Sequence, residues 1–289
     1  MKMKVIAMFV AAAGSMMLGG CGLTVLPVGL PTVSDGNENV QTSEVITPAD
    51  IASQVLDKIE DINYVESDAV YEYINGDSGY DKELWTETKH TVDFDNNLMK
   101  IERTDHNPLS GNHSTGCYIY DFENKRIYQK DMSPEGWSTG DLPETAIQSN
   151  YDMGAKILKQ VQEKNVRTTL EANGNVIDGK PVYKMTVDLD AATFLEFINV
   201  AMGEFILPEE YEEAGLSDKT IELEINVYKD SMLPATISVY QPVHIVAPVI
   251  YPSYEPDEEE KNMIFHISES FKNYNEAVNI EIPSNARSY

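Results

Sequence analysis

Residues 220–240, TIELEINVYKDSMLPATISVY, decide the fold class of this chain. Apolar and polar residues alternate over the first part of the stretch, and the apolar ones are Ile221, Leu223, Ile225 and Val227. This two-residue period is typical of a strand that is buried on one face. Residues 229–233 then turn the chain into a second apolar stretch at 234–240. Strands with so short a connection pair antiparallel, so the sequence predicts an antiparallel sheet.

The same period recurs on both sides of this hairpin. Strands are predicted over residues 65–73, 84–94, 98–103, 116–122, 126–130, 166–172, 182–189, 263–271 and 278–282. The polar stretches 95–97 and 123–125 are short turns of the kind that join neighbouring strands. We therefore expect strands that follow each other in the sequence to pair with each other.

Helical periodicity appears in three places. The first helix is predicted from Pro48, with Thr47 as its N-cap and Asp50 three residues after the cap. Its apolar stripe consists of Ile51, Val55, Ile59 and Ile62. A second helix is expected over 151–164 and a third, strongly apolar one over 191–202. A helix with so small a polar face as the third requires burial on nearly all sides.

The N-terminus has the layout of a secretory signal. Lys2 and Lys4 precede an apolar run over residues 5–18, which is short for a membrane span. The run ends in Leu-Gly-Gly-Cys21, which resembles the lipobox of bacterial lipoproteins. That resemblance implies a signal peptide at 1–20 and a lipidated Cys21, followed by a flexible tether to residue 46. The alternative is an ordinary secreted protein in which Cys21 is unmodified.

Charge and cysteine content exclude several classes of protein. The chain has 48 Asp and Glu against 21 Lys and Arg, a formal charge of −27, and no basic stripe that could collect phosphates. DNA and RNA are therefore not expected as partners. Loss of residues 1–20 would remove two lysines and no acid, giving −29. Cys117 would then be the only other thiol besides Cys21, which excludes a disulfide scaffold and a cysteine-rich zinc site.

The sequence contains no phosphate-binding loop, nucleophile elbow or His-Glu-x-x-His pair. His106 and His113 flank a loop close to Cys117, but their spacing matches no usual zinc site, and a solvated loop is favoured. Cys117 itself is interpreted as a small wall residue of a strand rather than a nucleophile. The acidic runs 209–213 and 257–260 lack the pattern of a calcium loop and indicate solvated faces. We expect no cofactor, no metal and no enzymatic activity.

The order of elements, from lipobox and tether through an amphipathic helix to antiparallel strands with helices between them, resembles lipoproteins of the LolA/LppX type. The resemblance covers about residues 47–283 and implies an α+β domain over 47–289. In that domain a single large curved antiparallel sheet, a half-barrel, wraps around helices. In such proteins the cavity accepts acyl chains or lipidated cargo, and there are no catalytic residues. The implied function is a membrane-anchored, extracytoplasmic, non-catalytic binder of a hydrophobic or amphipathic ligand.

Two groups of residues are the candidate ligand site. The expected cavity lining consists of Phe194, Leu195, Phe197, Ile198, Met202, Met153 and Leu158, whose alternative role is plain core. The Pro-rich segment 241–260 is expected to leave the sheet, because proline is excluded from central strands. Its apolar residues form a predicted flap over the open side, with a permanently packed loop as the alternative; they are Val243, Ile245, Val246, Val249, Ile250 and Tyr251.

The expected partners are the membrane, through the lipid anchor, and an apolar small molecule or lipid. An alternative function is a protein-interaction or sensor lipoprotein whose sheet is filled by its own helices. A closed interior without a pocket would favour that alternative.

Overall fold

The computed structural model describes residues 46–75, 81–107, 111–130, 136–142, 156–190, 192–193, 220–246, 260–276 and 279–288. Helix α1 (Pro48–Ile59) begins where the sequence predicts. The backbone N–H of Asp50 donates to Thr47 Oγ1 at 3.3 Å, and the N–H of Thr47 donates to Asp50 Oδ2 at 2.9 Å. This capping box satisfies donors that the first turn of a helix leaves unpaired.

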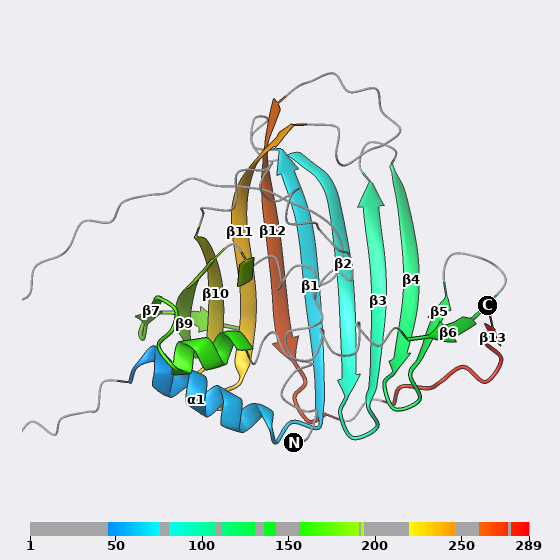
Figure 1. The fold of residues 1–289 in the computed structure, drawn as a ribbon, viewed down its shortest axis with the longest axis horizontal. Helices are drawn as coiled ribbons and strands as arrows, with labels where there is room; N and C mark the ends of the chain where they lie inside the picture. The colour runs from blue at the N-terminus through cyan, green and yellow to red at the C-terminus, as the bar shows by residue number, and fades with distance from the viewer. Residues whose placement is uncertain are drawn as a thin grey trace, which may run out of the picture.

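The rest of the described chain is dominated by one sheet of 13 strands. The strands are β1 (Tyr64–Asn75), β2 (Asp81–Asp93), β3 (Leu98–Asn107), β4 (Asn112–Asp121), β5 (Arg126–Lys130), β6 (Ser138–Asp141), β7 (Thr168–Glu171), β8 (Val176–Ile177), β9 (Lys180–Leu189), β10 (Ile221–Tyr228), β11 (Pro234–Val246), β12 (Glu260–Lys272) and β13 (Arg287–Ser288). Their order is β13-β6-β5-β4-β3-β2-β1-β12-β11-β10-β9-β7, with β8 paired to β9. The two ends do not meet, so the sheet stays open (Figure 1).

Two antiparallel meanders make up this sheet. One runs from β1 to β6 and the other from β9 to β12, and they join where β1 pairs with β12, with Tyr71 opposite Ile267. Sequential neighbours therefore pair within each meander, as predicted. The parallel pairing of β13 with β6 is the exception. The fold class predicted from the sequence, one large curved antiparallel sheet with helices against it, is confirmed (Figure 1).

Two predicted boundaries are wrong. Residues 279–283 form no strand; instead Ile280 packs on Leu98 and Ile119, so the apolar pattern anchors an extended segment rather than a strand. The segment expected to leave the sheet at 241 continues in β11 to Val246, with Pro242 opposite Ile264 of β12. Proline is tolerated there because the pairing of β10 with β11 ends earlier, at Val239, so among the described strands Pro242 has a partner on one side only.

The sheet has an inner face, against which α1 packs, and an outer face. In Figure 1, α1 lies along the lower ends of the strands from β7 to β12, next to the helical residues 156–162. Gln162 Nε2 donates to Ser53 Oγ of α1 at 3.1 Å. The buried side of α1 joins the main core through Ile51, Ala52, Val55 and Ile59. No helix of the described part is long and apolar enough to cross a bilayer.

Candidate functional site

The inner face of the sheet is apolar on β9 to β12 and of mixed polarity on β1 to β4. On the strands β9 to β12 the inward side chains are aliphatic and fully buried, among them Val187, Leu189, Leu223, Ile225, Ile237 and Val239. On β1 to β4 polar side chains share the face with apolar ones: the polar ones include Ser67, Thr88, His90, Arg103 and Asp105, and the apolar ones include Val65, Val92 and Met99. Strand alternation places all of these on one face. The inner face therefore has one apolar core over all these strands, and its polar side chains are concentrated on β1 to β4.

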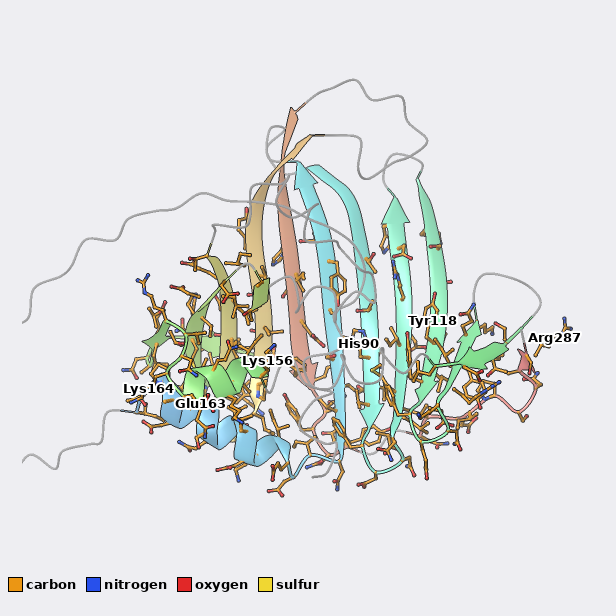
Figure 2. All side chains as sticks on the ribbon, in the orientation of Figure 1. His90, Tyr118, Lys156, Glu163, Lys164 and Arg287 are labelled. Atoms are coloured by element: carbon orange, nitrogen blue, oxygen red, sulfur yellow. The ribbon has the colours of Figure 1, made fainter. Side chains whose placement is uncertain are left out.

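Three polar side chains meet in a buried cluster on β1, β2 and β12, and one of them, His90, is labelled in Figure 2. Glu269 is 0%, His90 1% and Ser67 3% exposed. Ser67 Oγ donates to Glu269 Oε1 at 2.6 Å, and it lies 3.4 Å from His90 Nδ1. His90 Nδ1 is 3.8 Å from Glu269 Oε1. The register explains the meeting, since Ser67 is opposite His90 on β2, and Ala69 is opposite Glu269 on β12.

The cluster is electrically neutral at pH 7. Burial raises the pKa of Glu269 to about 8, against the opposing effect of the hydrogen bond from Ser67. Burial lowers the pKa of His90 to about 3. The carboxyl is therefore protonated and the imidazole uncharged, so their contact is not an ion pair. The hydroxyl of Ser67 is directed at the carboxyl rather than at the imidazole, which differs from the pairing that activates a nucleophilic serine.

Two polar atoms near the cluster have no hydrogen-bond partner within the described part of the chain. They are Glu269 Oε2 and Thr88 Oγ1. Both residues are opposite Ala69, on its two sides in the sheet. A side-chain hydrogen bond with Thr88 nevertheless acts on Tyr71, where it opposes the larger effect of burial, which raises the pKa of the phenol. Buried polar atoms in native proteins are rarely left unpaired, so Glu269 Oε2 is the atom that requires an explanation.

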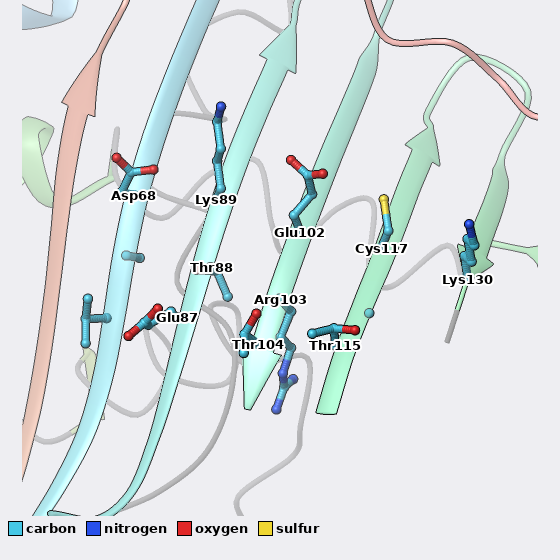
Figure 3. Close-up of a pocket in the computed structure, with 13 residues that line it drawn as sticks. Asp68, Glu87, Thr88, Lys89, Glu102, Arg103, Thr104, Thr115, Cys117 and Lys130 are labelled. Carbon is cyan, nitrogen blue, oxygen red and sulfur yellow. The ribbon is translucent and has the colours of Figure 1, made fainter. Parts of the chain in front are cut away.

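The outer face carries a shallow hollow of about 650 Å³ over β1 to β5 (Figure 3). Two rows of side chains line it. One row crosses five strands with charges on both sides of a thiol: Asp68, Lys89, Glu102, Cys117 and Lys130. The other consists of Val70, Glu87, Thr104 and Thr115. Most charges are paired within the sheet, for example Lys89 with Glu66 at 3.6 Å and Lys100 with Glu102 at 2.9 Å. The hollow therefore has little net charge with which to attract an ionic ligand.

Cys117 lies in β4, where the sequence predicts a strand. Burial raises the pKa of its thiol, with smaller effects of Lys100 and Glu102, so the thiol is protonated at neutral pH. His106 and His113 are opposite each other on β3 and β4, because both strands continue further into the predicted loop than expected. No group of three or more metal-ligating side chains occurs among the residues that the structure describes.

The predicted cavity lining is described only at Leu158. It is fully buried in the main core, within the helical residues 156–162. Val243, Ile245 and Val246 of the predicted flap belong to β11, where they pair with β12. The other predicted residues lie outside the described part of the chain: Cys21, Met153, Phe194, Leu195, Phe197, Ile198, Met202, Val249, Ile250 and Tyr251.

Sequence analysis did not find the buried cluster, although a signal for it exists. In the stretch 265–271, FHISESF, the apolar positions alternate, and Glu269 falls in phase with Ile267 and Phe271. The strand period therefore places a carboxyl on the apolar face. Ser67 and His90 occupy the same phase in their own strands.

No protein-family model and no curated protein sequence matches the chain. Among solved structures, the fold is similar to that of LprF from Mycobacterium bovis, with 11% identity and a TM-score of 0.45, over 82% of this chain and 96% of that one. A LolA superfamily protein from Nitrosomonas europaea is similar with 7% identity and a TM-score of 0.26, over 83% and 96% of the two chains. A DUF1329 family protein from Desulfovibrio piger has 12% identity and a TM-score of 0.27, over 80% and 93%. These similarities concern the fold alone.

Proposed function

We propose that this chain is a membrane-anchored, extracytoplasmic lipoprotein that binds a lipid-like ligand against the inner face of its sheet and catalyses no reaction. The observation that carries the proposal is the size of the inner face relative to α1. The helix has 12 residues and is about 18 Å long, whereas a sheet with this many strands is about 50 Å wide. The side chains on the aliphatic part of that face are buried, and we propose that they form the apolar wall against which an acyl chain packs.

The energetics of such a ligand are favourable. Burial of one methylene contributes about 0.8 kcal/mol, so a chain of about 16 carbons gains on the order of 12 kcal/mol. This gain exceeds most of the range for the cost of association, about 4–15 kcal/mol. An amphipathic ligand also matches the concentration of polar side chains on one part of the inner face.

The proposal can be tested with the full-length chain purified from membranes in a sugar-based detergent. Native mass spectrometry should show a co-purified lipid, and an apolar fluorescent probe should bind with a stoichiometry near one. Absence of both would contradict the proposal.

A matched pair of variants locates the binding surface. Ile267 is 1% exposed on the inner face, whereas Val176 is 62% exposed. Ile267→Phe should reduce the affinity for the probe at least fivefold, because it fills space beside the aliphatic part of the face, while Val176→Phe should leave the affinity unchanged. Equal affinities in the two variants would show that the probe binds elsewhere.

A second candidate function is a protein-interaction or sensor lipoprotein with a filled sheet. The complete burial of Leu223, Ile225 and Ile237 favours it, because these side chains present no open surface. On this hypothesis the wild-type protein binds no probe. Ile267→Phe would then only overpack the core, with a loss of about 1–3 kcal/mol in the free energy of unfolding.

A further inference from the structure

The hollow on the outer face is a furrow between the two rows of side chains that line it (Figure 3). Between the rows lie Ala69, Thr88, Arg103 and Gly116. Strand alternation directs their side-chain positions to the inner face, so the floor of the furrow is backbone. The rows are two residues apart along the strands, about 7 Å, and the longer row extends about 19 Å across its five strands. The volume of about 650 Å³ is within the usual range for small-molecule sites, about 300–1,000 Å³.

The charges of the furrow are balanced, although the chain as a whole has a formal charge of −27. Its walls carry five charged side chains, and three of them are in ion pairs with the next row of the sheet: Asp68, Lys89 and Glu102. The other two, Glu87 and Lys130, have opposite signs. An ionic ligand therefore meets no excess of opposite charge in the furrow, and the acidic chain around it repels anions.

The walls offer hydrogen-bond donors and acceptors side by side. The carboxylate of Glu87 is 58% exposed and accepts, and the exposed ammonium group of Lys130 donates. The hydroxyl groups of Thr104 and Thr115 do both. A ligand hydroxyl group also donates and accepts, so it can use every one of these groups. A carboxylate or phosphate can use the donors only, and an apolar ligand can use none.

The floor of the furrow disfavours a peptide as the ligand. An extended peptide binds a sheet through main-chain hydrogen bonds at an open edge. Ala69, Thr88 and Arg103 have partner strands on both sides, so the floor is part of the interior of the sheet. Recognition in the furrow therefore depends on the side chains of its walls.

We propose that this furrow is a binding site for an uncharged oligosaccharide. The sugar hydroxyl groups bind the carboxylate, ammonium and hydroxyl groups of the two walls. Val70 and Cys117 supply apolar positions that can contact the C–H groups of the sugar rings. The site is separate from the inner face to which the proposed function assigns the lipid-like ligand, because the sheet lies between them.

Isothermal titration calorimetry tests the proposal. The full-length protein is purified in a polyoxyethylene detergent, whose headgroup contains no sugar, and is titrated with maltohexaose, cellohexaose and N-acetylchitohexaose. Hexagalacturonate serves as the anionic oligosaccharide and hexaglycine as the peptide. We expect at least one uncharged oligosaccharide to bind with a Kd below about 1 mM and about tenfold more tightly than hexagalacturonate. The proposal is overturned if none does so, or if hexagalacturonate or hexaglycine binds as tightly.

Two variants of one residue assign the binding to the furrow. Thr115→Val removes a hydroxyl group from the wall and should weaken binding about fivefold, the effect of one neutral hydrogen bond. Thr169→Val, at an exposed position of β7, is the matched control and should bind like the wild type. Thr115→Trp fills the furrow and should abolish binding, with thermal melting to show that the variant is folded. Wild-type affinity in a folded Thr115→Trp protein would place the oligosaccharide elsewhere and overturn the proposal.

The outcomes distinguish this site from the proposed function. Thr115→Trp should bind the apolar fluorescent probe with the same affinity as the wild type, because the probe is expected on the inner face. A protein that binds the probe but no oligosaccharide retains the proposed function and refutes the furrow site. A protein that binds an oligosaccharide in the furrow but no probe does the reverse.

Discussion

Glu269 and His90 share one buried cluster, and burial shifts their pKa values in opposite directions for the same reason. A low-dielectric environment penalises the charged form of each group, which is the deprotonated carboxyl and the protonated imidazole. Each group therefore takes up or releases its proton at a different pH in the folded and the unfolded chain. Such a difference makes the stability of the fold depend on pH.

For Glu269, the folded chain retains a proton that the unfolded chain loses between pH 4.5 and about 8. We expect its contribution to the free energy of unfolding to fall by about 1.4 kcal/mol per pH unit in this window. For His90, the unfolded chain binds a proton that the folded chain does not, between pH 6.5 and about 3. Its contribution should therefore rise with pH by a similar slope, and the two effects should cancel between pH 4.5 and 6.5.

Urea denaturation of the wild type, Glu269→Gln and His90→Gln over pH 3–9 measures these slopes as differences, which removes the background from the many surface acids. Because each difference isolates one group, the difference between wild type and Glu269→Gln should fall through pH 4.5–8, and the difference between wild type and His90→Gln should rise through pH 3–6.5. Flat differences in both windows would show that the cluster is hydrated.

At the scale of the element, the segment over residues 279–288 covers the outer face of the sheet. Ile280 is 7% exposed and packs with Leu98 and Ile119, whereas Ile282 is 41% exposed. Ile280→Ala should lower the free energy of unfolding by about 2 kcal/mol. Ile282→Ala is the matched control and should change it by less than about 0.5 kcal/mol. Equal effects in chemical denaturation would mean that the segment does not hold Ile280 against the sheet.

Most strands of the sheet could be predicted because their apolar side chains alternate on a half-buried face. β5 matches its prediction at both ends, and β10 at its first residue. The sequence could not predict β6 (Ser138–Asp141) or its pairing with β13, because these short strands have few apolar residues and their pairing depends on contacts between distant parts of the chain. The sequence did not predict the end of β11, because a strand tolerates a proline such as Pro242 only if that position lacks a partner strand on one side, and the pairing is not visible in the sequence.

At the scale of the whole molecule, anchoring depends on one side chain that precedes the folded domain. If Cys21 carries the lipid, Cys21→Ala should release the protein from the membrane fraction without changing its melting temperature. Cys117→Ala is the matched control, and it should leave the protein in the membrane fraction. Membrane fractionation after a high-salt wash, followed by immunoblotting, measures both. A Cys21→Ala protein that stays membrane-bound would contradict the lipobox interpretation.

The candidate site could be predicted only in its general character. Apolar periodicity predicts that the sheet has a buried face, but which residues on that face remain polar and unpaired depends on the strand register. Along the chain, His90 is 23 residues from Ser67 and Glu269 is 202 residues from it. Only the pairing of β1 with β2 and β12 brings the three side chains together. Periodicity within one strand contains no information about that pairing.

Pro242 has a consequence for self-association. Beyond Val239, β11 has β12 on one side and no partner among the described strands on the other, so its open edge is a potential template for a second copy of the chain. A proline in that edge supplies no N–H group to an incoming strand. Pro242 thus leaves strand pairing at this position short of one backbone donor, which disfavours the addition of a further strand.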